Sequence, residues 1–232
     1  MPKPMHEQKL VIYPDTPHLI FCEGKDDYNF IVSLLILLTE TNEIFSQFRA
    51  YDFEGINNLG KDIDILPRTT GFSLVKSLIV IRDAEKDATS ACQSVLATFK
   101  NCGFAVPKGP CVKGQDGGCK HPHISTGFLL FPDCNDKPGK GSLEDLCLRI
   151  LANGQAGTFL SNAEAALKPV VDIGKLPRPH KNRLHTYFSL TDEFVSKKIG
   201  QAAKAGAFNY DAPEIVSIKT FLLEMAGHLP LN

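Results

Sequence analysis

Short apolar runs alternate with segments of helical spacing along the first two thirds of the chain. Four runs have the length and the branched apolar composition of buried strands: 18–22, 48–53, 78–81 and 128–131. The segments between them carry apolar residues three and four positions apart, as helices packed on a sheet do. Because parallel strands need helical crossovers, this order predicts an α/β fold with a mostly parallel sheet flanked by helices.

Polar residues mark where the predicted helices begin. Asp26 or Asp27 is expected to cap the first helix, and Asn57 a shorter second helix. Asp87 is expected to cap the third helix, and Ser142 opens a fourth with a pattern similar to a capping box.

Beyond residue 152 the sequence carries only helical signals. We therefore expect an α/β core over 1–152 with a loop insertion at 104–124. A helical C-terminal extension over 153–232 is expected to pack on that core. The insertion is rich in Gly and Pro, which is typical of a loop, a mobile hairpin or a flap over the site.

Cysteines and histidines gather in and after the insertion. They are Cys111, Cys119, His121, His123 and Cys134. Their spacing lacks the Cys-x₂₋₄-Cys pair of common zinc sites, which favours a covering loop over a zinc centre.

Composition excludes several classes of protein. The net charge of −1 argues against a protein that simply coats nucleic acid, since such proteins carry a large positive excess. Hydrophobic residues make up 43% of the chain and charged residues 22%, which excludes global disorder. No apolar run reaches the ~18 residues of a membrane span, and residues 1–10 lack the apolar stretch of a signal peptide. With seven cysteines expected as reduced thiols, the sequence predicts a cytoplasmic protein without membrane contact.

The average charge hides an asymmetry along the chain. Residues 15–87 carry 13 Asp and Glu against 7 Lys and Arg, a net of −6. Residues 161–208 carry 8 Lys and Arg against 4 Asp and Glu, a net of +4. A metal-holding site that faces a phosphate-holding surface would produce such a split, and so would chance.

Acidic residues follow two of the predicted strands at the point where each ends. Glu23 and Asp27 come after the first strand, and Asp83 and Glu85 after the third. In parallel sheets ligands bind at the carboxyl ends of the strands. Unpaired carboxylates held close together repel one another, and a divalent cation removes that cost. Mg²⁺ (or Mn²⁺) is suited to a few carboxylates together with water and substrate phosphate.

These residues resemble a known family. The pattern Glu-Gly-x-x-Asp at 23–27, followed by a strand that ends Asp-x-acid at 83–85, is similar to the Toprim domain of topoisomerases, DnaG-type primases and OLD-family nucleases. The likeness covers roughly residues 18 to 150 and is nearest to small stand-alone Toprim-like proteins related to the OLD nucleases. It implies a compact α/β sheet, Glu23 in acid–base or metal chemistry, and Mg²⁺ on the aspartates. The usual motif ends Asp-x-Asp, so Glu85 is one methylene longer, and Asp87 is an alternative ligand.

The resemblance extends to two further residues. Gly-Ser-Leu-Glu-Asp-Leu-Cys-Leu at 141–148 is similar to an acidic helix start in the same proteins, which makes Glu144 a candidate ligand of a second metal ion. In OLD-type nucleases a lysine downstream of the acids assists catalysis, and Lys181 is the candidate here by position.

Each candidate also has a purely structural interpretation. Glu23 could pair with Lys25 or Arg82. Glu144 lies in the first turn of a helix, where the exposed N–H groups favour acids. The basic segment 175–185 is either a phosphate-contacting surface or a solvated helix start.

Two classes of function therefore stay open. One is a Mg²⁺-dependent phosphodiesterase, a nuclease-like enzyme that acts on nucleic acid. The other is a non-catalytic Toprim-like module that binds a metal or a nucleotide and works through a partner protein. The chain carries no ATP-binding motif, so a partner ATPase or a homo-oligomer is the expected assembly if it does not act alone.

Overall fold

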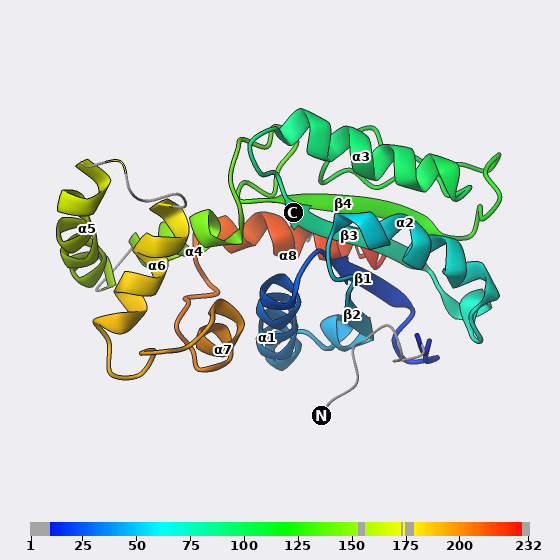
Figure 1. Cartoon of the computed structure of the whole chain (residues 1–232). Coiled ribbons are helices and arrows are strands. Elements are labelled where there is room, and N and C mark those ends of the chain that lie inside the picture. Colours follow the sequence, from blue (N-terminus) through cyan, green and yellow to red (C-terminus); the bar gives the residue numbers. More distant parts are fainter. Residues whose placement is uncertain (1–9, 153–155, 173, 175–178, 229–232) are drawn as a thin grey trace, which may run out of the picture.

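The computed structural model describes residues 10–152, 156–172, 174 and 179–228 (Figure 1). Four parallel strands form one sheet in the order β2-β1-β3-β4. Their bounds are β1 His18–Cys22, β2 Phe48–Asp52, β3 Ser77–Asp83 and β4 Ser125–Phe131. The predicted α/β class with a parallel sheet is confirmed. None of the helices within the described ranges is long and apolar enough to cross a membrane.

Two strands are longer than the apolar runs from which they were predicted. β3 begins at Ser77 and continues to Asp83, and β4 begins at Ser125. Among the added residues, Thr126 is polar but satisfied, since its hydroxyl donates to the Ala105 carbonyl at 2.8 Å. A buried hydroxyl with a partner carries little penalty, so the strand can extend beyond its apolar stretch.

Side chains of alternate strand residues belong to two separate hydrophobic clusters, one on each face of the sheet. Leu19, Phe21 and Val80 pack with α2 (Ile56–Ile65) and α3 (Ala88–Asn101). Ile20 and Ile79 pack on the opposite face with α1 (Lys25–Thr41), α4 (Leu143–Ala152), α7 (Ile199–Lys204) and α8 (Pro213–Met225). Figure 1 shows α2 and α3 on one side of the sheet and α1 and α8 on the other.

The C-terminal helices share the hydrophobic cluster of α1. A Cβ placed on Gly127 of β4 would lie 2.5 Å from Phe221 of α8, so only glycine allows this helix so close to the strand. A Cβ on Gly200 of α7 would lie 2.2 Å from the Cβ of Asn29 on α1. The remaining helices, α5 (Ala156–Asp172) and α6 (Pro179–Ser189), contact each other and α4 at one end of the molecule (Figure 1).

The helix starts correct part of the sequence analysis. Gly24, not Asp26 or Asp27, occupies the cap position of α1, and Gly55, not Asn57, caps α2. Asp26 instead accepts a hydrogen bond from the Gly200 N–H of α7 at 3.3 Å. Asp87 does cap α3, because its carboxylate accepts the N–H groups two and three residues further along.

The insertion between α3 and β4 lies along the outer edge of β4. The Cys111 N–H donates to the Phe128 carbonyl at 2.8 Å, and Gly114 exchanges two hydrogen bonds with Thr126. These bonds pair the strand edge that would otherwise expose backbone groups. Three short 3₁₀ segments complete the described structure: η2 Glu43–Gln47, η3 Leu66–Arg68 and η4 Phe72–Leu74.

Candidate functional site

Carboxylates from separate parts of the chain meet at the carboxyl ends of β1 and β3. Glu23 directly follows β1 and Asp83 is the last residue of β3. Because these strands are parallel neighbours, both residues lie at the same edge of the sheet. Asp27 enters from the first turn of α1, and Glu144 from the first turn of α4. Together with Glu85 we call these five residues the carboxylate cluster. Mutual repulsion among them contributes to the raised pKa values described below.

The backbone around Glu23 is held on both sides. Its N–H donates to the Ile81 carbonyl of β3 at 3.1 Å, and its carbonyl accepts from the Gly55 N–H at 2.8 Å. The residue therefore lies between the ends of β2 and β3. Its side chain is 20% exposed and so is reachable from solvent.

Arg82 is the nearest cation to Glu23. Its Nε lies 3.3 Å from the Glu23 carboxylate, yet neither atom has a hydrogen-bond partner among the residues that the structure describes. Burial raises the pKa of Glu23, and the nearby guanidinium opposes that rise only in part. The pair is therefore a charge contact without hydrogen-bond geometry, and one buried carboxylate oxygen keeps an unfilled acceptor position.

Asp27 is buried, with 7% of the residue exposed. Burial raises its pKa well above the usual range, and Asp83, Glu23 and Glu144 raise it further. The N–H of Gly24 donates to its carboxylate and opposes the shift. A Cβ at position 24 would lie 3.2 Å from the Asp27 Oδ2, so the glycine makes room for this carboxylate.

Asp83 connects the sheet to α4. Its Oδ1 accepts the Leu143 N–H, one of the free donors at the helix start, at 2.9 Å. Burial raises its pKa to about 7, against the hydrogen bond from Leu143, and the charges of Glu144 and Glu23 add to the rise. The side chain that ends β3 thus positions the helix that carries Glu144.

Glu144 is buried, with 5% of the residue exposed, and has two partners. Its carboxylate accepts the Ser142 hydroxyl at 2.6 Å and lies 2.7 Å from the Lys181 Nζ of α6. Burial raises its pKa, but the bonds from Lys181 and Ser142 outweigh burial and leave the pKa below its usual value. The lysine that was singled out by position is therefore in direct contact with one of the predicted ligands.

Glu85 lies at the rim of the cluster. Its backbone has φ 55°, a left-handed conformation that is uncommon for a residue with a side chain. Its N–H and carbonyl exchange hydrogen bonds of 2.7 and 2.8 Å with Gly141, just before α4. Its side chain is exposed, and its charge helps to raise the pKa values of Glu23 and Asp83. Asp87, the alternative ligand, has its carboxylate engaged as the α3 cap.

Two described residues of the basic segment 175–185 form ion pairs with different acids. Residues 175–178 lie outside the described part of the chain. Lys181 contacts Glu144, whereas Arg183 forms an ion pair with Glu164 of α5. The expectation of one surface facing the carboxylate cluster therefore holds for Lys181 and does not hold for Arg183.

The donor set fits a hard divalent cation, although the oxygens do not converge in this structure. Among the described residues no three Asp, Glu, His or Cys side chains lie close enough together to hold a metal ion. Nevertheless the buried Glu23 oxygen beside Arg82 has no hydrogen-bond partner among the described residues. Burial raises the pKa values of Asp27 and Asp83, and the charges of neighbouring acids add to the rise. A divalent cation supplies a counter-charge to such acids, and oxygen ligands are those that Mg²⁺ prefers.

Sequence reasoning named Arg82 only as a partner and missed Leu143 as a backbone donor. A charged residue inside a buried apolar strand, as at position 82, is the signal that could have placed Arg82 in the site. The donor of Leu143 has no such signal, because any residue at a helix start offers a free N–H.

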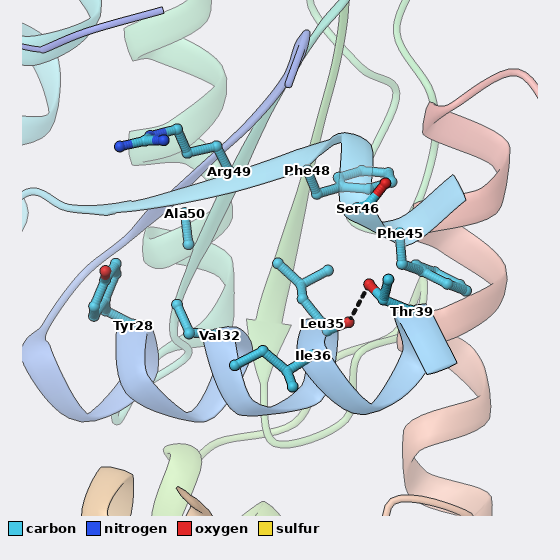
Figure 2. A pocket seen from close by; sticks show the side chains of 10 residues that line it. All are labelled: Tyr28, Val32, Leu35, Ile36, Thr39, Phe45, Ser46, Phe48, Arg49 and Ala50. Atoms are coloured by element: carbon cyan, nitrogen blue, oxygen red, sulfur yellow. Dashed lines mark hydrogen bonds between the residues drawn. The ribbon is translucent and has the colours of Figure 1, made fainter. Parts of the chain in front are cut away.

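A partly apolar hollow lies outside the carboxylate cluster. It has a volume of about 350 Å³ and lies between α1 and the edge strand β2 (Figure 2). Val32, Leu35 and Ile36 point into it from α1, facing Phe48 and Ala50. Thr39, Ser46 and Arg49 also line it, but no acidic residue is among the described residues of its lining, so the carboxylate cluster is the candidate site for metal chemistry.

The lowest-cost test of the cluster is the pH dependence of stability. Asp83 has a folded pKa near 7 against 3.8 when unfolded, and the folded pKa of Asp27 is also raised. A raised carboxyl pKa means that the folded state holds protons more tightly, so its stability is greatest at low pH and is lost as pH rises through the folded pKa. In EDTA the free energy of unfolding should therefore increase by a few kcal/mol from about pH 8 to about pH 5.

Urea denaturation at several pH values checks this expectation. Asp83→Asn should flatten the dependence, while Asp64→Asn, a change on the exposed face of α2, should leave it as it is. A wild-type protein whose stability falls steadily over that range would mean that the cluster is not a repelling group of acids.

Comparison with known proteins assigns the chain to one family. The family model described as "Protein of unknown function (DUF3226)" matches residues 17–227, so the chain belongs to this family. No curated protein and no solved structure gives a significant match.

Proposed function

We propose that this member of the DUF3226 family is a Mg²⁺-dependent phosphodiesterase that acts on nucleic acid, as the likeness to Toprim and OLD-type nucleases suggests. The observation that carries the proposal is that carboxylates from three parts of the chain lie near one sheet edge and raise one another's pKa values, with Lys181 in contact with Glu144. Parallel α/β sheets bind ligands at this edge.

Glu23, Asp27, Asp83 and Glu85 would hold the first metal ion, and Glu144 would contribute to a second. Bound Mg²⁺ supplies a water of lowered pKa and withdraws charge from a phosphate. The proposed count of one or two metal ions follows from this grouping: the acids that follow β1 and β3 form the first set, and the acid at the start of α4 would add the second ion.

The protein's own residues supply the remaining steps. Glu23, whose side chain is 20% exposed, accepts a proton, and burial raises its pKa toward the neutral range in which a general base is most effective. Lys181, whose side chain is 39% exposed, can turn its ammonium group toward a substrate phosphate and neutralise charge that develops on the leaving oxygen. Asp83 keeps α4, and with it Glu144, in place.

A second function is favoured by two specific contacts. Glu23 lies beside Arg82 and Glu144 beside Lys181, and both pairings are typical of a module whose acids are neutralised within the protein. In that case the chain binds a metal or a nucleotide and works through a partner protein, either an ATPase or another copy of itself.

Cleavage assays separate the two functions. Single- and double-stranded DNA and RNA are incubated with the purified protein in millimolar Mg²⁺, in Mn²⁺ and in EDTA. If the protein is an enzyme, we expect cleavage in the presence of metal. EDTA should stop this cleavage, and added Mn²⁺ should restore it. Intact nucleic acid in every condition, together with metal binding, would favour the module.

A further inference from the structure

A hollow of about 300 Å³ lies beside the carboxylate cluster, between α4, α5 and α6. Its lining is partly apolar, with charged residues around it. The charged residues are Lys140, Arg149, Arg183, Asp145 and Glu164. We call it the cationic hollow, because three of these five are cations.

The cationic hollow and the carboxylate cluster share two helices. On α4, Glu144 faces the cluster, while Asp145 and Arg149, one turn apart, line the hollow. On α6, Lys181 contacts Glu144, while Arg183 lines the hollow. A strand of nucleic acid that reaches the cluster therefore passes next to this hollow.

The acids of the hollow are already engaged, and its two arginines each pair with one carboxylate, Arg149 with Asp133 and Arg183 with Glu164. Asp145 accepts the Ser142 N–H at 2.9 Å, and Glu164 pairs with Arg183. A guanidinium carries five N–H donors, so one carboxylate contact leaves others for a ligand. The side chains of Arg149 and Arg183 are 46% and 43% exposed, and Lys140 is exposed.

We infer that the cationic hollow binds a phosphate of the nucleic-acid backbone that is not itself cleaved, and so fixes which phosphate reaches the carboxylate cluster. This rests on the proposed function. A polyanion is repelled by five clustered carboxylates, and cations one helix face away offset that repulsion. Planar guanidinium groups match the geometry of phosphate oxygens, which favours a phosphodiester chain as the ligand.

The test is direct binding of a fluorescein-labelled oligothymidylate, followed by anisotropy in EDTA over a range of salt concentrations. EDTA removes any cleavage, so only binding is measured. Lys140→Gln and Arg183→Gln should each weaken binding several-fold and lower the slope of log K against log salt by about 0.7. Glu164→Gln should tighten binding, because it releases Arg183 from its partner.

Matched controls carry the same charge changes elsewhere. Lys100→Gln at the end of α3 and Glu43→Gln at the start of η2 are exposed substitutions away from the hollow. They should leave both affinity and salt slope unchanged. Thermal melts of all variants confirm that each is folded.

Two results would overturn the inference: hollow variants that bind with the wild-type affinity and slope, or a wild-type protein that does not bind the oligonucleotide at low salt. Failure of the proposed function is recognised separately. In that case the unsubstituted protein shows no metal-dependent cleavage, while the differences in binding between the hollow variants and their controls persist.

Discussion

Replacing Glu23 with Gln should lower metal-dependent phosphodiester cleavage by about 10²- to 10⁴-fold, the range that a general base or a metal-activating group contributes. The amide keeps the shape of the side chain and removes both its charge and its ability to accept a proton. The fold should survive. Since burial raises the Glu23 pKa despite the nearby Arg82, the charged form is disfavoured in the folded state, and a neutral side chain removes that cost.

Cleavage rates and urea denaturation of the same preparations check both parts. Glu43→Gln, an exposed change at the start of η2, is the control for the loss of one carboxylate and should keep its activity. The interpretation of Glu23 as a structural partner of Arg82 predicts the opposite pattern. A Glu23→Gln protein that is destabilised but cleaves at the wild-type rate would remove Glu23 from the chemistry.

Millimolar Mg²⁺ or Mn²⁺ should raise the melting temperature of the protein above its value in EDTA. A ligand that binds only the folded state adds about 2.7 kcal/mol of stability at a concentration 100 times its Kd. For a chain of this length, 1 kcal/mol corresponds to roughly 2–4 °C, so a shift of about 5–10 °C is expected. The gain should be larger near pH 8, where the carboxylates of the cluster are ionised, than near pH 5.

Differential scanning fluorimetry measures the shift. Asp83→Asn should abolish most of it, because the substitution removes a proposed ligand from the end of β3. Asp64→Asn on the exposed face of α2 should respond to metal as the wild type does. Equal melting temperatures in EDTA and Mn²⁺ for all three proteins would indicate that the acids have only a structural role.

The class of fold was predictable because each buried strand is a continuous apolar run. β1 and β3 have buried residues on both faces, and such strands of a parallel sheet leave a clear signal in the sequence. Strand ends were less predictable. Ser125 and Thr126 belong to β4 because a carbonyl 21 residues earlier satisfies the threonine hydroxyl, and no local pattern carries that information.

The predicted caps of α1 and α2 were wrong for the same reason. Asp26 has the residue type of a cap, yet it accepts a hydrogen bond from Gly200, which is 174 residues away in the chain. Asp87 was predicted correctly because its partners are the N–H groups two and three residues further along, so the interaction is wholly local. Local interactions can be inferred from a sequence, whereas an interaction with α7 depends on how the whole chain packs.

The site shows the same division. That Glu23 and Asp83 meet follows from topology alone, because both end neighbouring parallel strands. The resemblance to OLD-type nucleases named Lys181 and Glu144 separately, and neither their contact nor the hydrogen bond from Leu143 to Asp83 was foreseen. Both contacts depend on where α4 and α6 pack against the sheet, and the spacing of residues in the sequence does not reveal that packing.

The central claim is that the carboxylate cluster binds a divalent cation, and a crystal of the protein soaked in Mn²⁺ tests it most directly. Anomalous scattering identifies manganese by element and gives its position independently of any activity assay. We predict an anomalous peak bounded by oxygens of Glu23, Asp27 and Asp83, with Glu23 drawn away from Arg82. A soaked crystal in which those carboxylates stay as they are, with no anomalous peak among them, would contradict the account.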